Sequence, residues 1–450
     1  MIDDKKETIH SRWNFKAFGV YLCNGFRSLV CSGLKRITAV IFIICATLML
    51  YLAITNKPVY PRIFNPNGRI ETIRVFIIVI IYALALLLFF FLLGAPLGAK
   101  RMNDNLKRAG LVNHIGEAPL LLSKKSLPSN NRVKVYEFYT MGISRDIWED
   151  KINELESALN LKIGHFEEGS NSRIIKMNAV DGNYTLPKKI DWSDNYLVQN
   201  ESGFTLVLGE DITGEKVTVN LKNIPHLLIG GSTGSGKSVL LKLLLMESVK
   251  KGAEVVISDF KGGVDFPSVW NEKCSIITDT KNLKHILTKI VDELETRKVI
   301  LKKSGLPNID EYNLHHSKKL NRIIFACDEV AELLDKTGLS KEAKAEVAEI
   351  EGYLSTISRQ GRACGIHLIL ATQRPDVNIL PGQIKNNLDY RVCGRADLVL
   401  SQIILDNGDA NDRIPKNAQG RFLDNSGNLF QSFWFDDKLW KTKTSSYHHF

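Results

Sequence analysis

The sequence predicts an α/β protein in which a domain with a parallel sheet follows a two-helix transmembrane hairpin and a small α+β unit. Residues 37–55 and 75–97 are apolar runs without a single charge. From Phe204 onward, short apolar strands alternate with helices, a pattern typical of a parallel sheet covered on both faces. A glycine-rich loop joins one of these strands to the next helix. The 450 residues leave room for two or three domains.

The two apolar runs are each long enough to cross a membrane, which takes about 20 helical residues. Both are apolar on all sides and lack the polar stripe of a surface helix, so we favour membrane spans over buried core helices. A cleaved signal peptide does not fit, because the first run begins late and a second follows. We therefore expect an N-terminal segment at 1–36, a transmembrane hairpin at 37–97 and a connector at 98–131.

The positive charge is concentrated next to the predicted spans. Residues 1–134 contain 19 lysines and arginines against 6 acids, a balance of +13, so residues 135–450 carry −3 of the total of +10. Juxtamembrane bases orient spans and attract anionic lipid, so the net charge does not indicate nucleic-acid binding. With two spans and a domain that uses cytoplasmic nucleotide, we expect both termini in the cytoplasm at the cell membrane.

Two segments show a fold pattern but no chemistry. Residues 1–36 are either a short amphipathic segment on the membrane surface or a disordered tail. In the small unit, 132–200, a strand, an amphipathic helix and two further strands are expected before a linker at 181–203. Ile147, Ile152 and Leu155 share one helical face, so packing or a subunit contact is its expected role.

The motor domain is expected at 201–440. It opens with a hairpin turned at Thr213-Gly214, and four apolar strands follow, HLLIGG, AEVVISDF, RIIFACDEV and GIHLILATQ. After the first of these strands comes a complete GxxxxGK[ST] motif, which consists of Gly231, Ser232, Thr233, Gly234, Ser235, Gly236, Lys237 and Ser238. Such a loop turns backbone N–H groups onto phosphates, and the next helix adds its dipole. It predicts ATP as ligand, with Lys237 on the β- and γ-phosphates and Ser238 on Mg²⁺.

Polar pairs end two other strands of this domain. Asp328 and Glu329 follow IIFAC, where Asp328 is placed to hold the Mg²⁺ shell and Glu329 to polarise the attacking water. An acidic pair after a strand is weak alone, but after a full phosphate loop it favours a hydrolase. Thr372 and Gln373 end a third strand, where a polar pair can sense the γ-phosphate. The alternative for that pair is an ordinary strand-end turn.

Several arginines are candidates for a finger inserted into a neighbouring subunit's site, where an arginine neutralises transition-state charge. The candidates are Arg297, Arg359, Arg362 and Arg391. Any single one is more often a surface or ion-pair residue.

The motor motifs, taken together and in order, resemble the FtsK/SpoIIIE-type DNA translocase motor. The resemblance covers roughly 200–435 and rests on HLLIGGSTGSGKSV, ISDFKGG, CDEVAELL, SRQGRACGIHLILATQRPDVNILPGQIKNNL and ILDNGDANDRIPKNAQGRFL. It implies a RecA-like fold, hexamers around a central channel and ATP-driven movement of DNA.

The resemblance also implies roles for individual residues. It assigns Lys237 and Ser238 to the phosphate loop and Asp328 with Glu329 to the metal and the water. Gln373 matches the family's sensor position, and Arg297, in DELETRK, matches an arginine expected to act in trans. The stretch that follows is expected to face the channel, where four lysines would touch DNA phosphates: Lys302, Lys303, Lys318 and Lys319.

Departures from the family pattern indicate the load. Chromosome-segregating members carry several spans, a long linker and a DNA-reading winged helix, none of which this sequence shows. Two spans, a small unit and a bare motor resemble the coupling proteins of Gram-positive conjugative elements, which implies relaxase and mating-channel proteins as partners. The alternatives are a chromosome or phage DNA translocase and a secretion-system ATPase that moves protein, since DFKGG also occurs in secretion motors.

Overall fold

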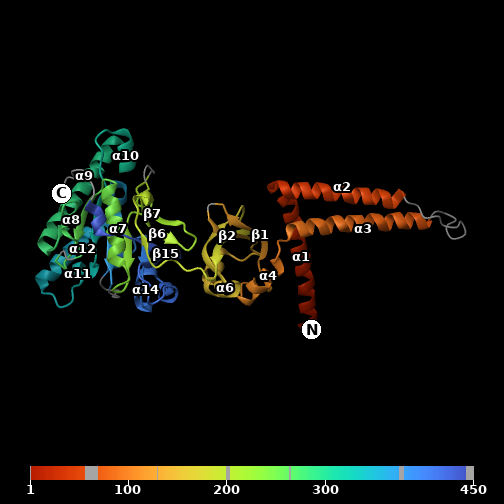
Figure 1. Ribbon diagram of the computed structural model, residues 1–450. Coiled ribbons are helices and arrows are strands. Elements are labelled where there is room, and N and C mark those ends of the chain that lie inside the picture. The colour runs from red at the N-terminus through yellow and green to blue at the C-terminus, as the bar shows by residue number, and fades with distance from the viewer. Residues whose placement is uncertain are drawn as a thin grey trace. The chain divides into compact units, whose positions relative to one another are not determined.

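The structure is a computed structural model that describes residues 2–55, 69–128, 130–198, 203–262, 265–373 and 380–441. The chain divides into two compact units, residues 1–184 and 185–450 (Figure 1). The division falls inside the linker expected at 181–203 and earlier than the domain boundary expected at 200/201.

The first unit combines long helices with a small sheet. Its helices are α1 (Ile2–Cys31), α2 (Gly33–Thr55), α3 (Arg69–Gly94), α4 (Ala99–Arg108), α5 (Arg145–Asp150) and α6 (Ile152–Leu159). Its strands are β1 (Leu120–Leu127), β2 (Asn130–Tyr139), β3 (Leu161–Glu168) and β4 (Ile174–Asp181). The four strands form an antiparallel sheet in the order β1-β2-β4-β3.

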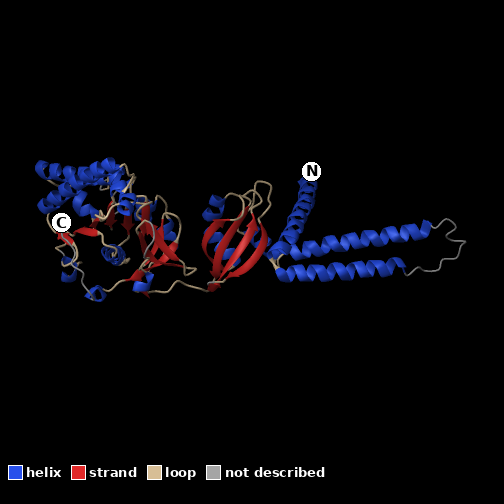
Figure 2. Cartoon of the chain, turned by 90° about the horizontal axis from the view of Figure 1, so that it is seen from above, coloured by secondary structure: helices blue, strands red, loops and turns tan. Residues whose placement is uncertain are grey.

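Helices α2 and α3 lie side by side as a hairpin (Figure 2). Gly33–Thr55 and Thr72–Gly94 are long and apolar enough to cross a membrane, and almost none of either stretch is buried inside the protein. Helical structure begins before the predicted runs. The second span ends at Gly94 rather than at residue 97, because Pro96 disfavours helix in the residue before it.

The N-terminal segment is one long helix, α1, rather than a disordered tail. It packs against the end of α3, where backbones meet at two glycines: a Cβ on Gly25 would lie 2.1 Å from the carbonyl oxygen of Phe90. A Cβ on Gly94 would lie 1.9 Å from the carbonyl oxygen of Tyr21. The crossing is extended by the stacked rings of Phe26 and Phe90, with centroids 4.3 Å apart.

The small sheet has one strand more than the sequence predicted. The strand β1 lies inside the expected connector at 98–131, and α4 precedes it. The predicted helix is split into α5 and α6 at Lys151. Trp148, Leu155 and Phe138 are fully buried between these helices and the sheet. Of the predicted helical face, Leu155 is buried as expected, but Ile147 is 41% exposed and its neighbour Trp148 is buried in its place. A strand rich in lysine was missed.

The second unit is built on one large sheet. Its strands are β5 (Ile190–Asp191), β6 (Thr205–Asp211), β7 (Lys216–Asn220), β8 (Leu227–Gly230), β9 (Glu254–Ser258), β10 (Ser275–Ile277), β11 (Ile323–Cys327), β12 (Ile366–Thr372), β13 (Tyr390–Cys393), β14 (Arg421–Asp424) and β15 (Leu429–Trp434). The order is β10-β9-β11-β12-β8-β13-β14-β15-β6-β7, with β5 paired to β15.

The strands from β10 to β13 are parallel, which confirms the predicted parallel sheet. The sheet continues with antiparallel strands β14, β15, β6 and β7, so it is mixed as a whole. The predicted hairpin is β6 with β7, and it forms the edge of this same sheet. The β5 strand, at 190–191, shows that part of the expected linker is a strand of the second unit.

Helices cover both faces of the parallel part. They are α7 (Lys237–Lys250), α8 (Ser268–Asn271), α9 (Thr280–Ser304), α10 (Ile309–His315), α11 (Val330–Leu334), α12 (Lys341–Cys364), α13 (Gly382–Lys385), α14 (Leu398–Leu405) and α15 (Asp409–Arg413). Val255 and Ile257 pack with α7 and α8, whereas their neighbour Val256 packs with α9 and α12. Because successive residues of a strand point to opposite faces, both faces are core, and the strands read as unbroken apolar runs.

Candidate active site

The polar residues of the site follow neighbouring parallel strands. In the register of the sheet, Gly230 of β8 lies between Thr372 of β12 and Cys393 of β13. Cys327 of β11 lies beside Ser258 of β9. The residues that come next in each strand therefore meet at the carboxyl edge of the sheet, where ligands of open α/β sheets bind.

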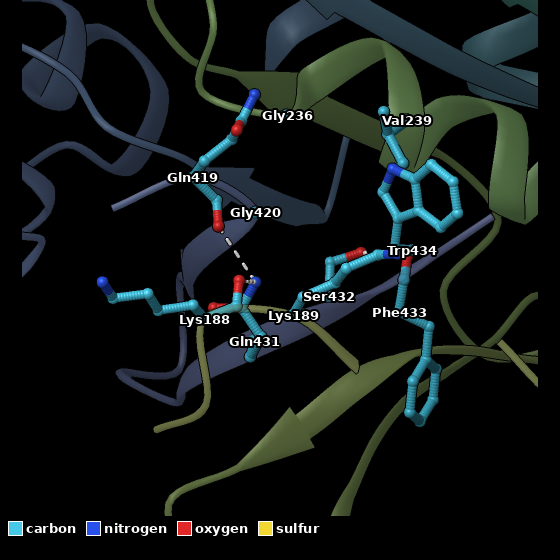
Figure 3. Close-up of a pocket in the computed structure, with 10 residues that line it drawn as sticks. All are labelled: Lys188, Lys189, Gly236, Val239, Gln419, Gly420, Gln431, Ser432, Phe433 and Trp434. Atoms are coloured by element: carbon cyan, nitrogen blue, oxygen red, sulfur yellow. Dashed lines mark hydrogen bonds between the residues drawn. The ribbon is translucent and has the colours of Figure 1, made fainter. Parts of the chain in front are cut away.

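The glycine-rich loop leaves β8 and enters α7 at Lys237. Gly234 and Gly236 have φ values of 75° and 102°, in the left-handed region that favours glycine. A Cβ at Gly236 would also lie 3.0 Å from the backbone of Gly420, the residue before β14, so a side chain there would force the two segments apart (Figure 3). The loop is anchored from outside by Ser232, whose N–H donates to the carbonyl oxygen of Arg395 at 2.8 Å.

Lys237, Ser238 and Asp328 form one cluster. The Lys237 ammonium, which is almost fully buried, lies 2.8 Å from Oδ1 of Asp328 and also donates to the Asp328 carbonyl oxygen. The Ser238 hydroxyl donates to the same Oδ1 at 2.9 Å. Thus Lys237 and Ser238, which the sequence predicted to work together with Asp328, both bind the same oxygen of that carboxylate.

A second lysine, Lys261, also binds Asp328. Its Nζ lies 3.0 Å from Oδ2 of Asp328 and 3.4 Å from Asp265. Burial opposes ionisation of Asp328, but the charges and hydrogen bonds of Lys237 and Lys261 outweigh it and lower the pKa of that carboxyl. Burial likewise opposes the charge on Lys261, but Asp328 and Asp265 raise its pKa. Both groups are therefore charged at neutral pH.

Glu329 is held by the end of the neighbouring strand. Its Oε1 accepts the hydroxyl of Thr372 at 2.8 Å and its Oε2 accepts the backbone N–H of Gln373 at 2.9 Å. The side-chain oxygen of Gln373 accepts the hydroxyl of Thr233 in the glycine-rich loop at 2.8 Å. The two polar strand ends and the loop are thus connected through one hydrogen-bonded chain.

A cavity of about 290 Å³ lies over these groups. Its walls are Ser232, Thr233, Gly234, Ser235, Gly236, Lys237, Ser238, Val239, Lys261, Asp265, Gln373 and Gln419. Every residue of the GxxxxGK[ST] motif except Gly231 contributes to these walls. Ligand cavities with several converging polar groups of this kind are the default binding sites of α/β domains.

Residues suited to Mg²⁺ lie at this cavity: Ser238 in its wall, and Asp328 hydrogen-bonded behind it. Ser238 and Asp328 supply hydroxyl and carboxylate oxygens, the ligands that Mg²⁺ takes in addition to water and substrate phosphate. Beside them Asp259, on the neighbouring strand end, is 2% exposed and its Oδ2 has no partner among the described residues. The donor set therefore fits a divalent cation, and an unpaired buried carboxylate oxygen is the kind of group that a hydrated cation satisfies.

Arg297 is placed away from this cavity, inside the fold. It is 3% exposed and its Nη1 donates to the carbonyl oxygens of Asn321 at 2.7 Å and Cys364 at 2.9 Å. A guanidinium that braces two buried backbone turns is not presented to a neighbouring subunit. The expectation that Arg297 acts in trans is therefore corrected: its contacts are those of a residue that holds α9 to the sheet.

The other candidate arginines are divided. Arg391 is tied to its own unit through Leu388, Lys385 and Asp406. Arg359 and Arg362 are exposed on α12, although each donates one hydrogen bond within the same unit, to the carbonyl oxygens of Ser355 and Lys222.

Three residues near the loop were not singled out from the sequence: Lys261, Asp259 and Arg395. Lys261 and Asp259 lie in the ISDFKGG stretch, directly after a buried strand, so their position was visible in the pattern. Arg395 follows β13, a strand of four residues that the periodicity did not reveal. Its Nη2 donates to the carbonyl oxygen of Thr233 at 2.6 Å and its Nη1 to that of Lys416 at 2.9 Å.

The fold and the loop define the class of P-loop nucleoside triphosphatases. A family model described as the FtsK/SpoIIIE family matches residues 192–326. The DNA translocase FtsK of Campylobacter jejuni is 35% identical over 219 residues, which are 46% of this chain and 22% of that protein. The DNA translocase SftA of Bacillus subtilis is 33% identical over 204 residues, 43% of this chain and 20% of that protein.

Among solved structures, the pCW3 conjugation coupling protein TcpA, in a monomer form with ATPγS, is 36% identical with a TM-score of 0.56. The match covers 76% of this chain and 96% of that one. The chain belongs to the FtsK/SpoIIIE family. It spans only about a quarter of the length of the curated translocases that it matches.

Proposed function

We propose that the protein is a membrane-anchored ATPase that moves DNA, and that it acts as a coupling protein that delivers DNA to a conjugative transfer channel. The observation that carries this proposal is the joined cluster of Lys237, Asp328 and Glu329 on a fold that matches a conjugation coupling protein over nearly its whole length. The two apolar helices support the membrane anchor.

The triphosphate of ATP would lie in the 290 Å³ cavity, against the backbone of the glycine-rich loop and the first turn of α7. Lys237 would turn from Asp328 to the β- and γ-phosphates. Lys261 would remain on Asp328 through Oδ2, so the carboxylate keeps a cationic neighbour when Lys237 leaves.

Mg²⁺ would be held by Ser238 and Asp328, and when bound it neutralises the charge of the β- and γ-phosphate oxygens. Glu329 would orient the attacking water and accept its proton. Thr372 and the N–H of Gln373 fix both carboxylate oxygens, so the base has one orientation before substrate arrives. The side chain of Gln373 would report the γ-phosphate through its bond to Thr233.

The proposal extends to the assembly and its place in the cell. Both termini would face the cytoplasm, where ATP is, and the motor would work as a homo-hexamer around DNA. Lys302, Lys303, Lys318 and Lys319, all exposed, would touch the DNA backbone. A relaxase and proteins of the mating channel would be the partners.

The test is ATP hydrolysis by the full chain in detergent micelles, without nucleic acid, with duplex DNA and with single-stranded DNA. Lys237→Ala serves as the blank. Stimulation by DNA supports a DNA motor, and the preferred form separates duplex translocation from strand delivery. Activity that depends on Lys237 but is indifferent to both DNAs at low salt would exclude DNA as the load and favour a motor that moves protein.

A further inference from the structure

Helix α1 runs across the ends of the two apolar spans instead of beside them (Figures 1 and 2). It ends at Cys31, two residues before α2 begins at Gly33, and it packs on the end of α3 through the close contact of Gly25 and Gly94. A helix that crosses the end of a membrane span lies at the level where the hydrocarbon core gives way to lipid headgroups. The spans therefore fix the depth at which α1 lies.

One side of α1 binds the small antiparallel sheet. Its residues form a row with spacings of four, four and three positions: Lys16, Val20, Asn24 and Arg27. Nζ of Lys16 lies 3.1 Å from a carboxylate oxygen of Glu117, and Nδ2 of Asn24 donates to the carbonyl oxygen of Leu122 at 2.9 Å. Nη2 of Arg27 lies 3.7 Å from a carboxylate oxygen of Glu137 on β2. This row, which we call the sheet row, is thus occupied by folded protein.

The opposite side of α1 is apolar. It carries a second row, which we call the apolar row, with the same spacing two positions later: Phe18, Leu22, Phe26 and Leu29. Two positions turn an α-helix by about 200°, so the apolar row lies on the side away from the sheet row. Phe26 is 50% exposed, and the other three side chains are at least partly exposed. A contiguous row of large, open apolar side chains marks a surface that something else covers.

The apolar row continues the surface of the second span. The ring of Phe26 stacks on that of Phe90, and the ring of Phe18 stacks on that of Phe91, with centroids 4.3 Å and 5.2 Å apart. Phe90 and Phe91 belong to the end of α3, whose residues 75–94 are all uncharged. Because the end of a span is surrounded by the upper acyl chains of a bilayer, the side chains stacked on it face the same surroundings.

Basic residues lie where the lipid headgroups would be. Lys35 and Arg36 are in the first turn of α2, and the Lys35 ammonium donates to the carbonyl oxygen of Leu93, at the end of α3, at 3.0 Å. Lys100 and Arg101 follow the second span in α4, and both are exposed. Cations at this level are attracted to lipid phosphates, most strongly to those of anionic lipids. A basic border beside an apolar row favours a lipid surface, rather than another protein, as what covers the row.

We infer that α1 is an interfacial helix, which lies in the plane of the membrane surface with its apolar row among the upper acyl chains and its sheet row turned to the small sheet. Helices that are apolar on one side and polar on the other bind in this layer between water and hydrocarbon. The helix then holds the small sheet against the bilayer. The inference rests on the membrane anchor of the proposed function and is independent of the ATPase reaction.

The test measures the surroundings of single labelled cysteines in the full chain, reconstituted into phosphatidylcholine vesicles. Cys23, Cys31 and Cys45 are first replaced by serine, and the other four cysteines are buried and should not label. A fluorophore is attached at Phe26→Cys, and its emission is quenched either by a nitroxide on the upper acyl chain of the lipid or by iodide in the water. We expect Phe26→Cys to lose as large a share of its emission to the lipid nitroxide as Val40→Cys, an exposed position near the start of the first span.

Two further positions on α1 complete the comparison. Leu22→Cys lies on the apolar row and leaves both stacked ring pairs in place, so it should be quenched by the lipid nitroxide as Phe26→Cys is. It decides the test if Phe26→Cys does not fold. Lys16→Cys, on the sheet row of the same helix, is the matched control and should be quenched by iodide but not by the lipid nitroxide.

The span position separates a failure of the anchor from a failure of the inference. If the lipid nitroxide does not quench Val40→Cys, the membrane anchor itself is wrong. If it quenches Val40→Cys, but Phe26→Cys and Leu22→Cys respond to iodide alone, the anchor stands and the inference about α1 is overturned. Equal quenching of Lys16→Cys and Phe26→Cys by the lipid nitroxide would also overturn it, because α1 would then have no side turned away from the lipid.

Discussion

At the residue scale, the charge balance around Asp328 shapes the site. Two lysines, Lys237 and Lys261, each bind one of its oxygens. The carboxylate is therefore neutralised before any ligand binds, and Lys237 has a defined place to rest. In a buried position an unpaired charge would cost several kcal/mol, so the two ammonium groups explain how the ionised acid is accommodated in the core.

Glu329→Gln is expected to bind ATP but to hydrolyse it at least 100-fold more slowly, because the amide keeps the shape but cannot accept the proton. ATP turnover and nucleotide binding are measured on the same preparation. Glu332→Gln, three residues later and exposed on α11, is the matched control and should keep wild-type turnover. Equal turnover by Glu329→Gln and the wild type would remove Glu329 from the reaction.

Glu247 makes stability depend on pH. Burial raises the pKa of this carboxyl to about 8, although the Val207 N–H and nearby lysines act in the opposite direction. The folded state therefore holds a proton that the unfolded chain, with an ordinary carboxyl pKa, has already released. The contribution to stability is complete below the ordinary pKa and is lost as pH rises toward about 8, by about 1.4 kcal/mol per pH unit.

Glu247→Gln should therefore raise the thermal unfolding midpoint at pH 8 and change it little at pH 4.5. The amide oxygen can still accept the Val207 N–H, which lies 3.0 Å from Oε2. Glu272→Gln, an exposed carboxyl of the same unit, should shift the midpoint at neither pH. A Glu247→Gln effect of equal size at both pH values would show that the carboxyl is ionised in the fold.

At the element scale, the crossing of α1 and α3 depends on the absence of side chains. Gly25→Ala would place a Cβ 2.1 Å from the Phe90 carbonyl oxygen, so the helices must separate. Gly19, on the same helix, has no heavy atom within 4 Å of its Cβ position. Alanine there should instead stabilise the helix slightly.

Hydrogen exchange of α1 in the full chain measures this difference. Gly25→Ala should speed exchange in α1 and at the end of α3, while Gly19→Ala should slow it or leave it unchanged. If both variants exchange as the wild type does, the close crossing of the two helices does not exist in solution.

At the scale of the whole molecule, the basic excess lies near the membrane, so any grip on DNA must come from a local cluster. Lys302→Ala with Lys303→Ala should reduce DNA-stimulated ATP hydrolysis. It should also lower the slope of log affinity against log salt by about 2, because each DNA phosphate that a lysine no longer neutralises lowers it by about 1. Basal hydrolysis without DNA should not change.

The matched control is Lys341→Ala with Lys344→Ala, two exposed lysines on α12. It removes the same charge from the same unit and should leave the salt slope as it is. If both double variants lower the slope equally, the effect reports net charge rather than a DNA-binding segment.

The sequence by itself determined the features that depend on neighbouring residues along the chain. The glycine-rich loop was readable because its backbone needs glycine at fixed spacing, and Gly234 and Gly236 have the expected positive φ. Asp328 and Glu329 could be predicted because they follow an apolar strand, and ligands of open α/β sheets bind at the carboxyl ends of the parallel strands. The two spans could be predicted because a helix of about 20 residues that is apolar on all sides is unstable in water and is stabilised in a lipid bilayer.

The tertiary structure alone decided which residues from distant segments meet. Arg297 is spaced like its family counterpart, but only the packing of α9 shows that its guanidinium turns inward to Cys364. Strand β1 contains lysines because one face of a small antiparallel sheet can be exposed to solvent. These lysines interrupt the apolar pattern by which a strand is recognised in the sequence. Trp434 and Lys189 lie far apart in the chain, and only the pairing of β5 with β15 brings them to one cavity, which opens beside the loop (Figure 3).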